Sequence, residues 1–274
     1  MTTLRAALVQ LRTPATQAAA LAQAEPLVRQ AASEGAQLIA TPEATNILQR
    51  ERARLFDAVR PLDEDECVQG LIGLARTLGV WILIGSALVR REDGLLANRS
   101  VLVGADGAIK ATYDKIHMFD VDLPTGERHR ESALYAPGER AAVAETPWGR
   151  IGLSVCYDVR FPHLYRGLAK AGAEMITVPA AFTRPTGEAH WEVLLRARAI
   201  ETGAFVLAPA QGGVHEDGRG TWGHSTIIGP WGQVLAKADH DEPAVIAADL
   251  DLDDVKKARD AIPALANDRA FAAP

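Results

Sequence analysis

The feature that most constrains the fold is an alternation of strand-like and helix-like runs that occurs twice along the 274 residues of this chain. In the first half, the apolar runs "RAALVQL", "AQLIATPE" and "VWILIGSALV" are typical of buried strands. Helical periodicity separates them over residues 17–33 and 63–78. The next run, "NRSVLVGADGAIKATYDK", predicts a hairpin that turns at residues 105–107.

The second half has the same order. The runs "RIGLSVCYD", "EMITVPAAF" and "AFVLAPA" predict strands, and "LYRGLAKAGA" and "HWEVLLRARAIETG" predict the helices between them. A hairpin turning at residues 230–232, the strand "PAVIAADLD" and a short helix from Asp253 follow. We therefore predict an α/β fold with two mixed sheets, helices outside them and an internal pseudo-repeat.

The composition is that of an ordinary globular protein, with 48% hydrophobic and 23% charged residues. A net charge of −6 gives no support to nucleic-acid binding, and no apolar run reaches the length that spans a membrane. The start "MTTLRAALVQ" has no signal-peptide pattern, and Cys67 and Cys156 do not form a disulfide framework. We expect a cytoplasmic protein with a single domain over residues 1–274, because no linker divides the chain.

Cys156 occupies an unusual position, because the apolar run "IGLSV" ends just before it and polar residues follow. One interpretation is a small buried core residue, since free cysteine is among the most buried residue types. The other is a nucleophile at a strand-to-helix corner, which exposes a reactive atom at the end of a strand. The position alone favours the buried core residue.

Two further reactive groups also follow predicted strands: Glu43 in "LIATPE" and Lys115 in "ATYDK". Taken singly, Glu43 would be a helix cap or solvated charge, and Lys115 a surface lysine. Open α/β sheets, however, bind ligands at the carboxyl ends of their strands. A carboxylate can activate the thiol of Cys156, and an ammonium group can stabilise a developing oxyanion.

The segments "TPE", "YDKIHMFDVD", "GLSVCYDVRFP" and "TGEAHWEVLLRARAIE" occur in the order found in the nitrilase (carbon–nitrogen hydrolase) superfamily, which this chain resembles from its first strand to about Asp249. The resemblance implies a four-layer α-β-β-α sandwich. It also implies a triad in which Cys156 is the nucleophile, Glu43 the general base and Lys115 the group that stabilises the tetrahedral intermediate. Attack on an amide would give a thioester and release ammonia, and water activated by Glu43 would hydrolyse the thioester.

The same resemblance implies supporting roles for other residues. The backbone N–H of Tyr157 would help to stabilise the intermediate, and Glu131 in "RESALYAPG" would position Lys115 and the substrate amide. Burial is expected to raise the pKa of Glu43. Lys115 would favour the thiolate of Cys156 and Glu43 would oppose it, and the sequence does not show which effect is larger.

Within the superfamily, the chain most resembles the Nit branch. The stretch "APAQGGVHEDGRGTWGHS", which contains Gln211, resembles the deaminated glutathione amidases more than the ω-amidases. We therefore expect hydrolysis of the side amide of a small α-keto acid. The alternatives are an ω-amidase acting on α-ketoglutaramate, an N-carbamoyl amidohydrolase or, further behind, a true nitrilase. A non-enzymatic binding protein on this fold would lack a triad member, and none is missing.

Carboxylates on such substrates require cationic groups near the site. The first candidate is Arg160, four residues after Cys156, and the alternative is that Arg160 braces the corner through Asp158. The second candidate is the loop from Phe182 to Gly187, including Thr183, because it follows a predicted strand end.

No metal or cofactor is implied, because the spacing of His117, Asp120 and Asp122 has no zinc motif beside it. The expected partners are a small-molecule substrate and a second copy of the chain, since relatives form homodimers through the helix layer next to the nucleophile. Neither a nucleic acid nor a membrane is expected. The chain departs from many relatives at His163 and in its C-terminal "ANDRAF".

Overall fold

In the computed structural model, residues 3–123 and 126–272 are described, and two six-stranded sheets form the centre of the protein. The first sheet has the strand order β16-β1-β2-β3-β4-β5. Its strands are β1 (Thr3–Gln10), β2 (Leu38–Ala40), β3 (Trp81–Arg90), β4 (Leu96–Val103), β5 (Ile109–Asp114) and β16 (Ala244–Asp251). β1, β2 and β3 are parallel to one another, whereas β4, β5 and β16 pair antiparallel with their neighbours.

The second sheet has the order β15-β14-β11-β10-β9-β8. Its strands are β8 (Ala142–Thr146), β9 (Gly149–Leu153), β10 (Met175–Thr177), β11 (Phe205–Ala208), β14 (Thr226–Ile228) and β15 (Val234–Lys237). Three parallel strands, β9 to β11, are again followed by an antiparallel hairpin, and β8 is the antiparallel edge strand. The two sheets therefore share three parallel strands followed by a hairpin, which confirms the predicted pseudo-repeat. They differ in the origin of the antiparallel edge strand, because β16 ends the first sheet from late in the chain whereas β8 directly precedes β9.

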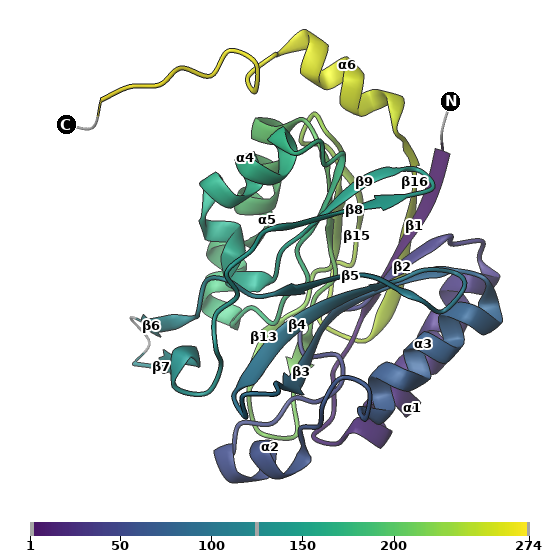
Figure 1. Cartoon of the computed structure of the whole chain (residues 1–274), viewed down its shortest axis with the longest axis vertical. Coiled ribbons are helices and arrows are strands. Elements are labelled where there is room, and N and C mark those ends of the chain that lie inside the picture. Colours follow the sequence, from purple (N-terminus) through teal and green to yellow (C-terminus); the bar gives the residue numbers. More distant parts are fainter. Residues whose placement is uncertain (1–2, 124–125, 273–274) are drawn as a thin grey trace.

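Helices cover the outer face of each sheet (Figure 1). α1 (Gln17–Ser33) and α3 (Glu66–Leu78) pack on the first sheet, and α4 (Pro162–Lys170) and α5 (Arg184–Thr202) pack on the second. The strand β1 shows why the layers form. Its residues Leu4 and Leu8 lie in the core between the sheets, whereas Ala7 and Val9 lie in the core beneath α1 and α3, because successive strand side chains point to opposite faces.

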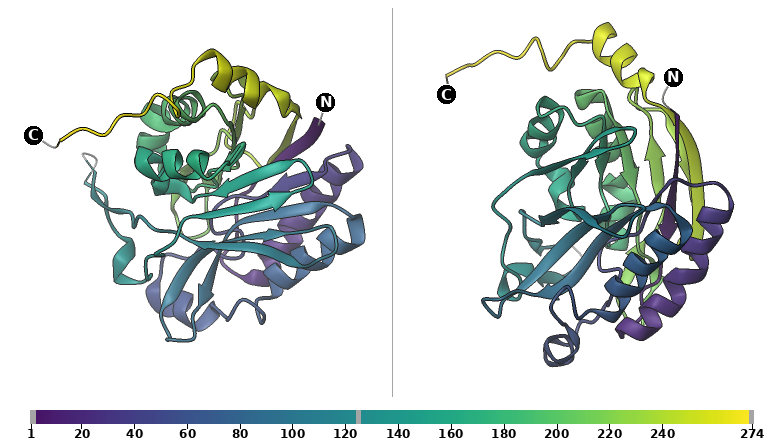
Figure 2. Two further views of the ribbon diagram at one scale, coloured as in Figure 1. Left: turned by 45° about the horizontal axis from the view of Figure 1, so that its top comes forward. Right: turned by 45° about the vertical axis from the view of Figure 1, so that its right-hand side comes forward.

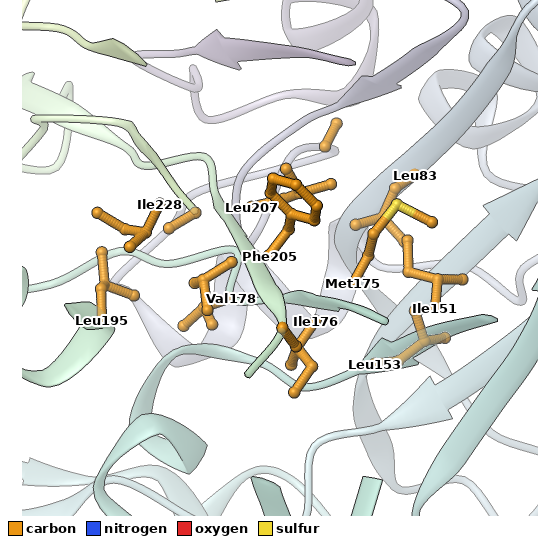
Figure 3. Packing of buried hydrophobic residues seen from close by; sticks show 14 of the residues in the cluster. Leu83, Ile151, Leu153, Met175, Ile176, Val178, Leu195, Phe205, Leu207 and Ile228 are labelled. Atoms are coloured by element: carbon orange, nitrogen blue, oxygen red, sulfur yellow. The ribbon is translucent and has the colours of Figure 1, made fainter. Parts of the chain in front are cut away.

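The core between the two sheets continues to the helices of the second half (Figure 3). Leu83 of β3 lies beside Met175 and Ile151 of the second sheet, and Leu195 of α5 lies near Ile228 and Val178. All of these side chains are fully buried. The predicted four-layer α-β-β-α sandwich is therefore confirmed.

Smaller elements complete the chain. They are α2 (Arg52–Ala58), the strand pairs β6 (Asp120–Asp122) with β7 (Arg128–Arg130) and β12 (Gly212–Val214) with β13 (Gly220–Trp222), and α6 (Asp253–Ala261). None of these except α6 was expected from the sequence. After α6 the chain first passes beside α4 and then extends past the sandwich (Figure 2). There, Asp268 of "ANDRAF" pairs with Arg166 of α4 at 3.1 Å.

Several predicted boundaries differ from the structure. The helix expected over residues 63–78 begins at Glu66, because Asp65 is its N-cap and accepts a hydrogen bond from the N–H of Val68 at 2.9 Å. The strand expected to continue through Cys156 ends at Leu153, and a short 3₁₀ helix, η2 (Cys156–Arg160), follows. The described residues contain no helix that is long and apolar enough to cross a membrane.

Candidate active site

The structure brings Glu43, Lys115 and Cys156 together, as predicted from their places after strands. They follow β2, β5 and β9, and their relative exposures are only 6%, 2% and 8%. All three line one cavity with a volume of about 270 Å³. A thiol, a carboxylate and an ammonium group thus share one cavity next to the carboxyl ends of strands from both sheets.

The Lys115 ammonium lies between two carboxylates. Its Nζ donates to Oε1 of Glu43 at 3.0 Å, and to Oε1 and Oε2 of Glu131 at 3.0 and 2.8 Å. Glu131 begins the 3₁₀ helix η1 (Glu131–Ala133), and its Oε2 also accepts the N–H of Phe119 at 2.7 Å. Glu131 is therefore placed to hold Lys115, which agrees with its predicted position beside the site.

Asn98 is a site residue that the sequence analysis missed. Its Nδ2 donates to Oε1 of Glu43 at 2.9 Å and to Oε1 of Glu131 at 3.2 Å, so it links the two carboxylates. The signal in the sequence was a polar residue within the apolar strand β4, at a position that is 3% exposed. The second oxygen of Glu43 accepts the N–H of Ala181 at 2.8 Å, which completes the carboxylate's hydrogen bonds.

The charges at the site follow from these contacts. Burial favours the neutral form of Glu43, but the ammonium of Lys115 and hydrogen bonds from Cys156, Lys115 and Asn98 outweigh it and lower the pKa. The expected effect of burial is present, but it does not decide the net direction, so the pKa of Glu43 is lowered and not raised. Despite burial, Glu131 and Glu43 raise the pKa of Lys115. Burial and Glu43 raise the pKa of Cys156, and Lys115 does not compensate for them. The resting site thus holds a thiol, a carboxylate and an ammonium.

The backbone of Cys156 has a left-handed conformation, with φ of +51°. Such a conformation is unfavourable for a residue with a side chain and is found at functional sites that hold it in place. The N–H of Cys156 donates to the carbonyl of Pro179 at 2.9 Å, which ties this corner to the segment after β10. This sharp turn directs the thiol into the cavity, as expected of a nucleophile rather than a core residue.

A buried carboxylate braces the turn. Asp158 accepts the N–H of Val155 at 2.8 Å, the hydroxyl of Tyr113 at 2.7 Å and the N–H of His117 at 3.1 Å. The Nδ1 of His117 lies 2.7 Å from Asp158 as well. Bracing through Asp158 therefore comes from these residues and not from Arg160. His163 lies outside the cavity, with its ring 5.6 Å from that of His117.

Arg160 does not reach the cavity. Its guanidinium lies 5.9 Å from the ring of Tyr157 and 5.4 Å from that of Phe182, and two of its nitrogens lie 3.3 Å from Nδ1 of His190. It packs behind these aromatic rings, so the prediction that it faces the substrate is not supported by its position. Tyr157, Phe182 and Thr183, by contrast, all line the cavity.

The four arginines that do line the cavity are Arg50, Arg128, Arg130 and Arg219. Sequence analysis missed them because none lies next to a triad residue in the chain. Two come from β7 and two from irregular segments, after β2 and between β12 and β13.

Gln211 lies beneath the site rather than in it. Its Nε2 donates to Oγ1 of Thr13 at 2.6 Å and to the backbone carbonyl of Glu43 at 2.9 Å. Its Oε1 accepts the N–H of Thr13 at 3.0 Å, and the residue is fully buried. Gln211 therefore fixes the backbone of Glu43 and does not line the cavity.

The three residues considered as metal ligands have other partners. His117 contacts Asp158, Asp120 accepts hydrogen bonds from Ser132, and Asp122 pairs with Arg130 at 2.8 Å. Within residues 3–123 and 126–272, no group of three or more His, Cys, Asp or Glu side chains has the arrangement of a metal site.

Comparison with known proteins agrees with this geometry. Residues 5–260 match the carbon-nitrogen hydrolase family over nearly the whole chain. The chain belongs to this family. It is a hydrolase that acts on carbon–nitrogen bonds other than peptide bonds.

Its similarity to individual members is also extensive. It is 43% identical to a deaminated glutathione amidase of Yersinia enterocolitica, over 91% of this chain and 87% of that protein. It is 36% identical to an omega-amidase of Xenopus tropicalis, over 96% and 94% of the two chains. The crystal structure of the C. elegans NitFhit protein superposes with a TM-score of 0.91 at 32% identity, over 98% of this chain and 66% of that one. The Nit-branch resemblance predicted from the motifs is confirmed.

Proposed function

We propose that this member of the carbon-nitrogen hydrolase family hydrolyses the side amide of a small α-keto acid, with deaminated glutathione as its leading substrate. The observation that carries the proposal is the convergence of Cys156, Glu43 and Lys115 in one cavity. The 43% identity to the deaminated glutathione amidase of Yersinia enterocolitica supports this substrate. The cavity of about 270 Å³ suits a small molecule.

The charges of the resting site indicate the order of proton transfers. Cys156 attacks the amide carbon as its proton passes to the ionised Glu43, so no free thiolate is needed beforehand. The oxygen of the amide becomes an oxyanion, which the Lys115 ammonium and the N–H of Tyr157 stabilise. Glu43 then returns the proton to the leaving nitrogen as the C–N bond breaks. The result is a thioester on Cys156 and a free amine.

The second half of the reaction uses the same groups. Water attacks the thioester carbon while Glu43 accepts its proton, and the C–S bond breaks with return of that proton to the sulfur of Cys156. The products are a carboxylic acid and the original thiol. Glu131 acts through Lys115, because its carboxylate holds the ammonium at 2.8 Å and balances its charge.

The expected release of ammonia does not apply to every proposed substrate. Ammonia leaves only from an unsubstituted amide such as α-ketoglutaramate. With deaminated glutathione, the leaving amine is the amino group of cysteinylglycine, and the acid is α-ketoglutarate. Release of the keto acid is thus the measurement that applies to both substrates.

An ω-amidase activity on α-ketoglutaramate is the second candidate, favoured by the 36% identity to the omega-amidase of Xenopus tropicalis. An N-carbamoyl amidohydrolase and a true nitrilase are alternatives further behind. The two keto-acid amides share an acyl group and therefore a thioester. They differ only in the leaving amine, so rates of thioester formation will separate the two functions.

The test measures α-ketoglutarate release from both amides by the wild-type protein, Cys156→Ala and Cys67→Ala. Cys67 is the matched control, because it is the other free thiol and lies fully buried away from the cavity. We expect a preference for deaminated glutathione that Cys156→Ala abolishes and Cys67→Ala retains. Preference for α-ketoglutaramate would favour the ω-amidase, and activity in Cys156→Ala would refute the nucleophile.

We further propose a cytoplasmic, single-domain protein that forms a homodimer and has no nucleic-acid or membrane partner. A groove beside α5 and α6 supports the dimer, because Ile200, Trp231 and Ile262 line it and are 55%, 59% and 57% exposed. Light scattering should give twice the chain mass for the wild type and a smaller value for Trp231→Glu. A monomeric wild type would contradict the dimer.

A further inference from the structure

The mouth of the active-site cavity is cationic. Arg50, Arg128, Arg130 and Arg219 line the cavity together with the triad. The side chains of Arg128, Arg130 and Arg219 are 80%, 51% and 33% exposed, and Arg50 is exposed as well, so they lie at the solvent end. The carboxylates that line the cavity, Glu43 and Glu131, lie at its buried end and hold Lys115.

Three of these arginines have a carboxylate within ion-pair distance. Arg130 makes a two-pronged contact with Asp122, at 2.9 and 2.8 Å, and Arg128 lies 3.5 Å from the same carboxylate. The guanidinium of Arg219 is 3.6 Å from Asp217, which is longer than a hydrogen bond. The guanidinium of Arg50 forms no hydrogen bond or ion pair with any residue in 3–123 or 126–272. Among the described residues, Arg50 has no competing partner, and the Arg219 guanidinium keeps its hydrogen-bond donors although Asp217 partly balances its charge.

Arg50 and Arg219 approach the cavity from different parts of the chain. Arg50 follows β2 and precedes α2, and Arg219 lies in the turn between β12 and β13. Their charges converge on one imidazole, because burial, Arg219 and Arg50 all lower the pKa of His129, although Glu127 opposes them. Arg219 is less exposed than Arg128 and Arg130. Its charge also acts on Tyr135, whose pKa burial and Glu131 raise and Arg219 lowers.

We propose that Arg219 binds the carboxylate of the keto-acid part of the substrate, and that Arg50 attracts anionic substrates to the mouth of the cavity. This inference rests on the proposed function, whose substrates all carry a carboxylate beyond the scissile amide. A guanidinium matches a carboxylate with two parallel hydrogen bonds and keeps its charge at every physiological pH. Ordinary bond lengths place the carboxylate carbon of an α-ketoglutaryl amide about 5 Å from the carbon of its scissile amide.

The proposal assigns selectivity to arginines at the mouth and leaves the chemistry to the triad. It also gives the segment after β11 a part in substrate choice. Gln211 itself is buried, whereas Arg219, eight residues further along, reaches the cavity.

The test compares α-ketoglutaramate with its carboxyl methyl ester, which has the same chain without the negative charge. For Arg219→Gln, we expect the ratio of kcat/KM between acid and ester to fall about ten- to a hundredfold, since charge-assisted hydrogen bonds are lost. For Arg219→Lys the ratio should fall by less, because lysine keeps the charge but lacks the planar guanidinium that forms two parallel hydrogen bonds. Arg50→Gln should lower the ratio about threefold and weaken its dependence on salt.

Arg54→Gln is the matched control. Arg54 lies on α2 near Arg50, pairs with Glu51 at 2.7 Å and does not line the cavity. Its substitution removes one positive charge from the same region and should leave the ratio unchanged. An equal fall in Arg54→Gln, or an unchanged ratio in Arg219→Gln and Arg219→Lys, would overturn the proposal.

Binding separates this inference from the proposed function. Titration of α-ketoglutarate into the Cys156→Ala protein measures the carboxylate site without turnover. The comparison protein carries Arg219→Gln in addition to Cys156→Ala. If the wild type hydrolysed neither amide, but α-ketoglutarate bound to Cys156→Ala and bound more weakly to the double variant, the function would fail and the arginine site would stand. If the wild type hydrolysed the amides but α-ketoglutarate binding did not depend on Arg219, the function would stand and the arginine site would fail.

Discussion

The Nζ atom of Lys115 lies 3.0 Å from Oε1 of Glu43, and both side chains are almost completely buried. Burial of two unpaired charges would be strongly unfavourable, whereas this contact keeps both groups ionised. Since Glu131 also contacts Lys115 and Asn98 links the two carboxylates, the pair forms part of a network. The consequence is a base that is already deprotonated when the substrate arrives.

The pH dependence of the reaction follows from this network. Lys115 and the hydrogen bonds hold the pKa of Glu43 below its ordinary 4.5, and burial and Glu43 hold that of Cys156 above its ordinary 9.0. The active form therefore persists between these two values. We expect kcat/KM to be flat from pH 4.5 to pH 9.0, where the protein stays folded. A rise of activity with a midpoint inside this range would indicate a thiolate or a different base.

Replacement of Glu43 by glutamine should lower kcat about 10²- to 10⁴-fold, because it removes the proton acceptor and leaves the shape unchanged. The measurement is kcat against pH for both amides. Stability should change with pH as well: the lowered pKa means that Glu43 stabilises the fold above pH 4.5, and this contribution is lost as pH falls through its folded pKa. Wild-type kcat and profile in Glu43→Gln would refute its role as base.

Cys156 should react with iodoacetamide faster than Cys67, and its labelling should abolish activity. Cys156 lines the cavity, whereas Cys67 is fully buried on α3 and lies near Asp65 and Glu66. Because the pKa of Cys156 is raised, its labelling rate should increase as pH rises above 9.0. Mass spectrometry of labelled peptides gives both rates. Equal labelling of the two cysteines without loss of activity would contradict the assignment.

Much of the fold could be predicted from the sequence because the apolar periodicity of each element agrees with its layer. Strands such as β3 are apolar on both faces, and the helix before β3, α3, begins with a clear cap at Asp65. The short pairs β6 with β7 and β12 with β13 were missed. Each of these strands has only three residues, too few for a recognisable period.

The site was predictable only in part for a related reason. Glu43, Lys115 and Cys156 lie just after strands, which suggested that they meet, and the family resemblance implied that they form a triad. Asn98 faces them from within β4, and Arg219 enters from a turn. Their approach depends on how the two sheets pack, which no local pattern encodes. The predicted direction of the pKa shift of Glu43 was wrong for the same reason, since the groups that lower this pKa come from distant strands.

Gln211 should affect the reaction without affecting substrate choice. Gln211→Ala leaves Thr13 and the carbonyl of Glu43 without their buried hydrogen-bond partner, which should lower the free energy of unfolding by about 1–3 kcal/mol. We expect kcat to fall for both the acid and ester forms of α-ketoglutaramate, with their ratio unchanged. Chemical denaturation and kinetics measure the two effects. A changed ratio would place Gln211 in substrate recognition.

The two halves of the chain lie in close contact at Gly85. A Cβ added to Gly85 of β3 would lie 1.8 Å from the carbonyl oxygen of Thr41 and 2.4 Å from Cβ of Pro179. The segment containing Thr41 leads to Glu43, and the carbonyl of Pro179 accepts the N–H of Cys156. Both neighbours are rigid, so the alanine must push apart the segments that carry the base and the nucleophile.

Gly85→Ala should therefore lower the free energy of unfolding by about 1–3 kcal/mol through overpacking and reduce kcat even in the folded protein. Gly73→Ala on α3 is the matched control, because a Cβ there meets no atom within 4 Å, and the better helix propensity of alanine should raise stability slightly. Thermal unfolding and kcat of the two variants decide the matter. If Gly85→Ala kept wild-type stability and kcat, close contact at this glycine would not be what sets the separation of Glu43 and Cys156.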